Sequence, residues 1–99
     1  MKKLVWAELA RRELEAAADH YFNLEPGLEN RFLDDADSTI DRIKKSPLTW
    51  KRNSASTRAI NLSVFPYSII YRERDTAIQI IAITHQRQKP FYWIDRLKK

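Results

Sequence analysis

The fold of this 99-residue chain is decided by residues 67–84, YSIIYRERDTAIQIIAIT. Residues 67–73 and 77–84 are rich in isoleucine and tyrosine, which favour strands, and the polar triplet RDT between them is typical of a tight turn. Two strands joined this tightly run antiparallel. Residues 77–84 are nearly all apolar, which is typical of a central strand that is covered on both faces.

A third strand is predicted just upstream, at residues 58–65, RAINLSVF, with FPY as the turn into residue 67. Its alternation places on one face Ile60, Leu62 and Val64. Residues 46–57, SPLTWKRNSAST, are polar and aperiodic, so we predict a loop there. The three strands should form an antiparallel meander.

The first half of the chain predicts a strand at 3–6, KLVW, and two amphipathic helices. The first helix covers 7–22, with an apolar stripe formed by Ala7, Ala10, Leu14, Ala17, Ala18 and Tyr21. After a turn at Pro26–Gly27, the second helix continues to Lys45, with an inward face formed by Leu28, Phe32, Ala36, Ile40 and Ile43. The order β-α-α-β-β-β predicts an α+β fold in which a helical hairpin packs on an antiparallel sheet.

Size and composition indicate one domain, residues 1–99, in a reducing cytoplasm, because the chain has no cysteine. The start, MKKLVWAELARRELE, lacks the apolar region of a signal peptide, and no apolar run approaches the roughly 18 residues of a membrane span. There is no HxxH or HExxH pattern, and a single glycine cannot build a phosphate loop, so we expect no metal and no cofactor.

Charge is divided unevenly between the two halves of this basic protein. Residues 1–49 carry 8 Lys/Arg and 10 Asp/Glu, whereas residues 50–99 carry 10 Lys/Arg and 3 Asp/Glu. A basic second half favours an acidic partner, either a nucleic acid or an acidic protein, although a net charge can also serve solubility alone.

Three segments in this order resemble the RelE/ParE superfamily, the small toxins of type II toxin–antitoxin modules. They are VWAELARRELEAAADHYF at the front, Arg58 followed by FPYSIIY, and HQRQKPFYWIDR at the end. The resemblance implies a toxin that a separate antitoxin neutralises by wrapping around it. RelE-like members cut messenger RNA in the ribosome, whereas ParE-like members, associated with plasmid stabilisation, inhibit DNA gyrase.

Departures from the nuclease pattern favour the ParE-like alternative. Where RelE-like nucleases resemble one another in their catalytic lysines, arginine and tyrosine, this chain has in turn Ala59, Asn61, Ser68 and Trp93. Only their arginine beyond the last strand has a counterpart, Arg87, although Tyr92 is adjacent to the tyrosine position. RNA cleavage needs a positioned base, an acid and cations, so these replacements argue against a nuclease.

Single side chains leave alternatives open. His85 can act as a base near neutral pH, or it can be a hydrogen-bonded structural residue. Arg58 can hold a phosphate or carboxylate, or pair with Asp37 or Asp41 of the second helix. In the tail KPFYWIDRLKK we expect Phe91, Trp93 or Ile94 to fold back on the sheet. The residues expected to point outward are Lys89, Arg96, Lys98 and Lys99.

The first hypothesis is a ParE-like growth inhibitor that binds gyrase without catalysis. The target or antitoxin is expected to meet Arg58, His85, Arg87, Lys89, Trp93 and Arg96. The second is a ribosome-dependent endoribonuclease that uses His85, Arg87 and Tyr92. The third is a non-toxic RelE-fold partner in a repressor complex. The free chain is expected to leave apolar surface exposed near Tyr21, Phe22 and Leu24, and either a homodimer or a toxin–antitoxin hetero-oligomer is possible.

Overall fold

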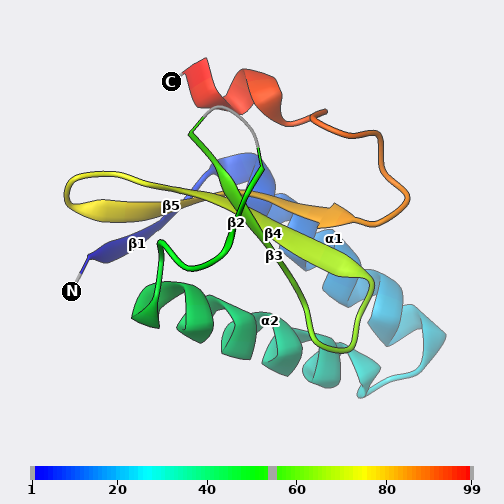
Figure 1. Ribbon diagram of the computed structural model, residues 1–99. Helices are drawn as coiled ribbons and strands as arrows, with labels where there is room; N and C mark the ends of the chain where they lie inside the picture. The colour runs from blue at the N-terminus through cyan, green and yellow to red at the C-terminus, as the bar shows by residue number, and fades with distance from the viewer. Residues whose placement is uncertain (1, 54–55, 99) are drawn as a thin grey trace.

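The computed structural model describes residues 2–53 and 56–98 (Figure 1). Its helices and strands are, in chain order, β1 (Lys3–Trp6), α1 (Glu8–Leu24), α2 (Leu28–Lys45), β2 (Lys51–Arg52), β3 (Arg58–Asn61), β4 (Tyr67–Glu73), β5 (Ala77–His85) and a 3-10 helix, η1 (Ile94–Lys98). The predicted first strand and both predicted helices are confirmed, with α1 two residues longer at its end than expected.

The strands form one five-stranded sheet in the order β1-β5-β4-β3-β2. The β2, β3, β4 and β5 pairings are antiparallel, and β1 joins the outer side of β5 in parallel, so the sheet is mixed. The two helices cover one face and the C-terminal segment crosses the other (Figure 1). The predicted α+β class and the helical hairpin on a sheet are confirmed.

The hairpin of β4 and β5 is the centre of the molecule, and it carries apolar side chains on both faces. The pairing steps from Ile70 with Ala82 to Tyr71 with Ile80, so β5 holds one extra residue, Ile81, at a β-bulge. The helices cover Ile69, Tyr71, Ile78, Ile80 and Ile83. Ile70, Ile81 and Ala82 pack with Trp93 on the opposite face. The prediction of a central strand buried on both sides is confirmed.

The predicted strand 58–65 is wrong beyond Asn61, where β3 ends. Ile60 and Leu62 are buried as expected, but Val64 is 73% exposed. The cause is Asp35 on α2. Its carboxylate accepts hydrogen bonds from the backbone N–H groups of Ser63 (3.0 Å), Val64 (2.8 Å) and Phe65 (3.0 Å). These bonds turn the chain away from the sheet before residue 64.

The predicted loop 46–57 contains one short strand, β2, which pairs with β3. Lys51 lies opposite Ala59 in this pair, and Arg52 lies opposite Arg58. Residues 54–55 of the predicted loop lie outside the described residues.

The tail folds back on the sheet through Trp93, which is 2% exposed. Phe91 and Ile94, the other two residues considered for this role, remain 44% and 40% exposed. Lys89 and Lys98 are exposed as expected, whereas Lys99 lies outside the described residues. No helix in the described ranges is both long and apolar enough to cross a bilayer.

Candidate functional site

A cleft of about 380 Å³ opens on the sheet face that the helices leave uncovered. We call it the sheet cleft. Its base is formed by Ala59, Ile70 and Trp93, its walls include Asn61, Ser68, Thr84, His85, Gln86 and Gln88, and exposed side chains at its mouth are Lys51, Lys89 and Phe91. None of the described residues that line it carries a carboxylate. The cleft therefore offers amide, hydroxyl, cationic and aromatic groups to a ligand.

The four positions at which this chain departs from the nuclease pattern meet in the sheet cleft. Ala59, Asn61 and Ser68 line it from β3 and β4, and Trp93 closes it from the tail. The Ser68 hydroxyl donates a 2.5 Å hydrogen bond to the amide oxygen of Asn61. Neither side chain can supply a cation or move a proton near neutral pH. The four replaced positions therefore share one cleft, which they line with a methyl group, an amide, a hydroxyl and an indole.

His85 is held at the end of β5 by its neighbours. Its Nδ1 accepts a hydrogen bond from the backbone N–H of Arg87 (3.0 Å), and its backbone N–H donates to Oε1 of Gln88 (2.8 Å). Its ring stands edge-on to Tyr67, with the ring centroids 5.0 Å apart. With Nδ1 accepting from the backbone, the ring is fixed in orientation by contacts within the chain. His85 also lines the sheet cleft.

Tyr92 lies outside the sheet cleft and its proton is held by a carboxylate. The hydroxyl donates to Oε2 of Glu13 on α1 at 2.5 Å. Burial, followed by this hydrogen bond, raises the pKa of Tyr92 to about 12. An acid for a leaving group near neutral pH needs a lower pKa and an accessible proton, so Tyr92 is poorly suited to that role.

The expectation that Arg96 points outward is wrong. Its guanidinium forms an ion pair with Glu13, with Nη1 to Oε1 at 2.8 Å and Nη2 to Oε2 at 3.1 Å, and the side chain is only 15% exposed. Nη1 also donates to the backbone oxygen of Ile81 (3.0 Å), while Glu13 accepts the N–H of Ile83 (3.1 Å). Since β1 pairs with β5 only as far as Ile80, this ion pair satisfies the open edge of β5 beyond it.

Glu13 was not predicted, although the sequence holds a signal for it. It lies three residues after Ala10 and four before Ala17, on the apolar stripe of α1. Asp35 occupies the same kind of position on α2, three residues after Phe32. A carboxylate on a buried apolar stripe needs hydrogen-bond donors from the rest of the protein. Glu13 and Asp35 both have such donors.

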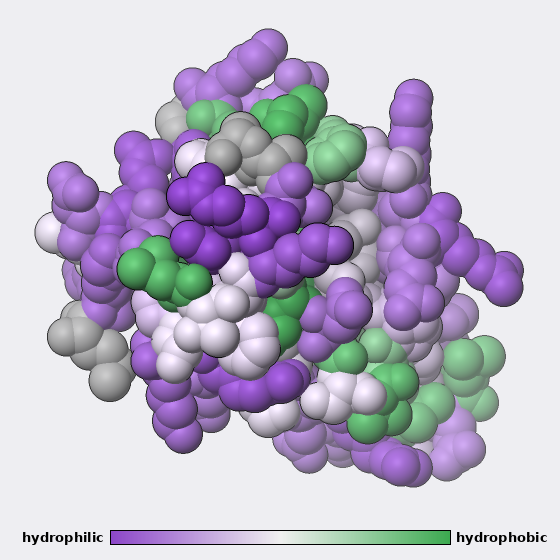
Figure 2. Space-filling model, in the orientation of Figure 1, coloured by the Kyte–Doolittle hydropathy of each residue, from purple (hydrophilic) through white to green (hydrophobic). Residues whose placement is uncertain are grey.

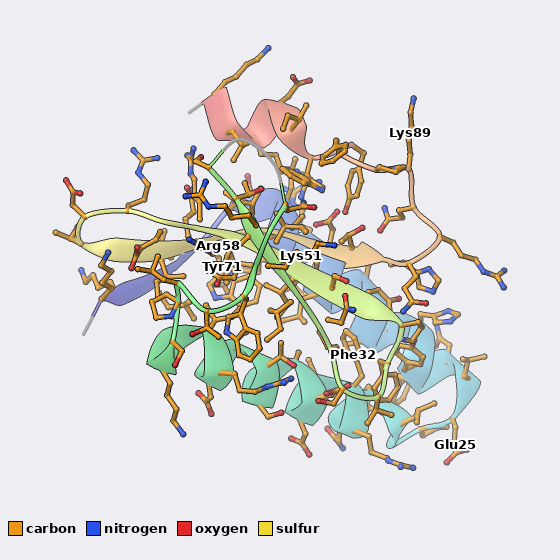
Figure 3. The ribbon with its side chains drawn as sticks, in the orientation of Figure 1. Glu25, Phe32, Lys51, Arg58, Tyr71 and Lys89 are labelled. Carbon is orange, nitrogen blue, oxygen red and sulfur yellow. The ribbon has the colours of Figure 1, made fainter. Side chains whose placement is uncertain are left out.

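The remaining predicted site residues lie apart from one another. The side chains of Arg87 and Lys89 are exposed on the segment after β5, where Figure 3 shows Lys89 extended away from the sheet. Arg58 is half-buried beside Tyr71, and its guanidinium donates to the backbone oxygen of Trp50 (3.0 Å). Within the described chain it makes no ion pair with Asp37 or Asp41. Trp93 is buried and Arg96 is paired, so neither presents its side chain freely to a partner.

An apolar patch lies at the end of the helical hairpin. Phe22 is 49% exposed and Leu24 is 64% exposed, which confirms the expectation for these two residues. Tyr21 instead packs inward against Phe32 and Phe65, with ring centroids 5.3 and 4.8 Å away. Figure 2 shows apolar surface gathered at this end of the molecule, over the α1–α2 turn and the loop between β3 and β4. No group of three or more metal-binding side chains occurs in residues 2–53 and 56–98.

Comparison with known proteins agrees with this architecture. One solved structure, described as the chromosomal ParDE TA system from P. aeruginosa, contains a chain that matches with a TM-score of 0.76 and 24% sequence identity. The match covers 86% of this chain and 96% of that one, and it supports the fold. No curated protein matches significantly.

The family model of the ParE toxin of the type II toxin–antitoxin system, parDE, matches residues 4–90, and the chain therefore belongs to this family.

Proposed function

We propose that this toxin acts in the cytoplasm by binding its target and not by cutting RNA, with DNA gyrase as the target that the family implies. The observation that carries the proposal is the composition of the sheet cleft. Four of the positions where a nuclease would hold catalytic groups line this cleft, and they carry alanine, asparagine, serine and tryptophan. Residues 1–99 act as one toxin domain in this proposal.

Two of the three other groups that a nuclease could use, His85 and Tyr92, are engaged in contacts within the chain. Cleavage through the 2′-hydroxyl requires a base, an acid and cations placed around one phosphate. The Nδ1 of His85 accepts a backbone hydrogen bond, and the hydroxyl of Tyr92 is bound to Glu13. Arg87 is exposed, but a single cation without a placed acid and base gives little rate enhancement. These contacts support a binding mechanism over the endoribonuclease alternative.

Two surfaces are assigned to partners. The exposed cations beside the sheet cleft, Lys51, Arg87 and Lys89, meet the target, and electrostatic steering makes this encounter sensitive to salt. The apolar patch at Phe22 and Leu24 is covered by the antitoxin, which neutralises the toxin in a hetero-oligomer. Trp93 and Arg96 hold the C-terminal segment in place and do not make the contact themselves.

The test is induction of the chain without an antitoxin, with growth, message 5′ ends and supercoiling by purified gyrase measured in parallel. A gyrase-binding toxin stops growth, leaves message ends intact and inhibits supercoiling. Arg87→Ala should weaken inhibition, whereas His85→Ala should change it less than threefold. New message ends within minutes that disappear in His85→Ala would establish the nuclease instead. Normal growth would establish the non-toxic alternative.

A further inference from the structure

Two arginines face each other at the outer edge of the sheet. Arg52 of β2 is the register partner of Arg58 of β3. Directly opposite residues in an antiparallel pair have Cβ atoms about 4.5–5.5 Å apart, and like charges placed there are destabilising. β2 is only two residues long, so this pair makes up half of its register. The arrangement weakens the edge of the fold unless an anion lies between the two side chains.

Neither Arg52 nor Arg58 forms an ion pair with an acidic side chain of the described ranges. The guanidinium of Arg58 donates to the backbone oxygen of Trp50 at 3.0 Å, and this acceptor carries no formal charge. Glu73 is the carboxylate that borders the same region, and its Oε2 lies 2.9 Å from the Nζ of Lys2. Arg52 itself is exposed.

Both arginines line a second cleft of about 290 Å³, on the side of the sheet away from the sheet cleft. We call it the arginine cleft, and its other lining residues are Leu48, Ser56, Thr57 and Glu73. Leu48 is 62% exposed there, so an apolar contact is available beside the two guanidinium groups. The combination suits a ligand that carries an anionic group and an apolar group close together.

The open edge of β2 adds a backbone contact. The N–H of Asn53 donates to the backbone oxygen of Thr57, toward β3, at 3.0 Å. Backbone groups alternate in direction along a strand, so the N–H and C=O of Arg52 point to the outer side, where no described strand lies. An extended segment can pair with Arg52 there, as in strand addition to a sheet edge.

We propose that the arginine cleft binds an extended acidic segment of a partner protein, with one carboxylate between Arg52 and Arg58 and an apolar side chain on Leu48. A carboxylate fits better than a phosphate group because Glu73 lines the same cleft and repels a doubly charged ligand more strongly. Arginine forks bind carboxylates through paired hydrogen bonds. This site depends on the proposed function in one respect: the antitoxin of the proposed toxin would be the natural partner that supplies such a segment.

The test uses the purified chain and a capped peptide with Glu and Leu two positions apart, so that both face one side when extended. Backbone amide shifts report binding at residues 52 and 58. Arg52→Glu should reduce peptide affinity at least tenfold and raise the melting temperature by about 2–5 °C, because a glutamate there attracts Arg58. Lys51→Glu, with the same charge change on the opposite face, should reduce affinity less than threefold and leave the melting temperature unchanged.

Several outcomes would overturn the site. Equal losses in both variants would mean that net charge alone attracts the peptide. No amide shift at residues 52 and 58 up to millimolar peptide would exclude the site, and so would full binding by Arg52→Glu. Tighter binding of an oligothymidylate at these amides would assign the site to nucleic acid. None of these measurements involves growth arrest, so this inference and the proposed toxicity can fail independently.

Discussion

Glu13 of α1 and Arg96 of η1 form a two-pronged ion pair across 83 positions of the chain, at 2.8 and 3.1 Å. Glu13 accepts a hydrogen bond from the backbone N–H of Ile83, and Arg96 donates one to the backbone oxygen of Ile81, so the pair satisfies the open edge of β5. It also holds the C-terminal segment, which includes Trp93, against the sheet. The base of the sheet cleft therefore depends on a contact far from the cleft in sequence.

Loss of this ion pair should destabilise the fold. Arg96→Met removes the partner of a mostly buried carboxylate, and we expect a loss of about 2–3 kcal/mol in the free energy of unfolding, measured in urea. The control is Arg12→Met, which breaks the exposed Arg12–Glu8 pair and should cost less than about 0.5 kcal/mol. Equal effects in the two variants would contradict a structural role for Arg96.

Asp35 should make the stability of the chain depend on pH in the acid range. Burial alone would raise the pKa of Asp35, but the backbone hydrogen bonds from residues 65, 64 and 63, with the charge of Arg42, outweigh burial and lower it. A lowered pKa means that the carboxylate stabilises the fold above its unfolded value of about 3.9, and that this stability is lost as the pH falls toward the folded value.

The measurement for Asp35 is urea unfolding at a series of pH values, with Asp35→Asn beside the unchanged chain. The variant should lose about 1–3 kcal/mol near pH 7, because an amide oxygen cannot replace a carboxylate for three donors. The difference between the two chains should shrink as the pH falls below about 4. A constant difference across this range would contradict the assignment.

Tyr92→Phe separates a structural tyrosine from a catalytic one. The variant keeps the ring and loses the hydrogen bond to Glu13, so we expect about 1 kcal/mol less stability and unchanged growth arrest. The pKa of Tyr92 is raised to about 12, so the contribution of this bond is complete below the unfolded pKa of about 10 and is lost as the pH rises toward 12. Loss of toxicity in a folded Tyr92→Phe chain would favour the nuclease hypothesis.

Val64 and Ile60 form a matched pair for the end of β3. Val64 is 73% exposed, so Val64→Ala should change the free energy of unfolding by less than about 0.5 kcal/mol. Ile60 is 6% exposed, and Ile60→Ala should cost about 2–4 kcal/mol. Similar losses in the two variants would mean that residue 64 packs inward after all.

The sequence by itself determined the helices, the hairpin of β4 and β5, and the α+β class. These features follow from local periodicity and turn chemistry, which residues close in sequence specify. The family resemblance also named Ala59, Asn61, Ser68 and Trp93, and the structure brings these four side chains into one cleft. The resemblance to a family pattern could predict that these residues lie together, because positions that form one site in a fold also lie together in related proteins.

Tertiary structure alone decided where Glu13 and Asp35 find their donors, and hence that Arg96 turns inward and that β3 stops at Asn61. It also decided that β1 lies beside β5 and that Arg52 faces Arg58. The reason is physical. A buried carboxylate and an unpaired strand edge must both be satisfied, but their partners lie up to 83 positions away, where no local pattern links them.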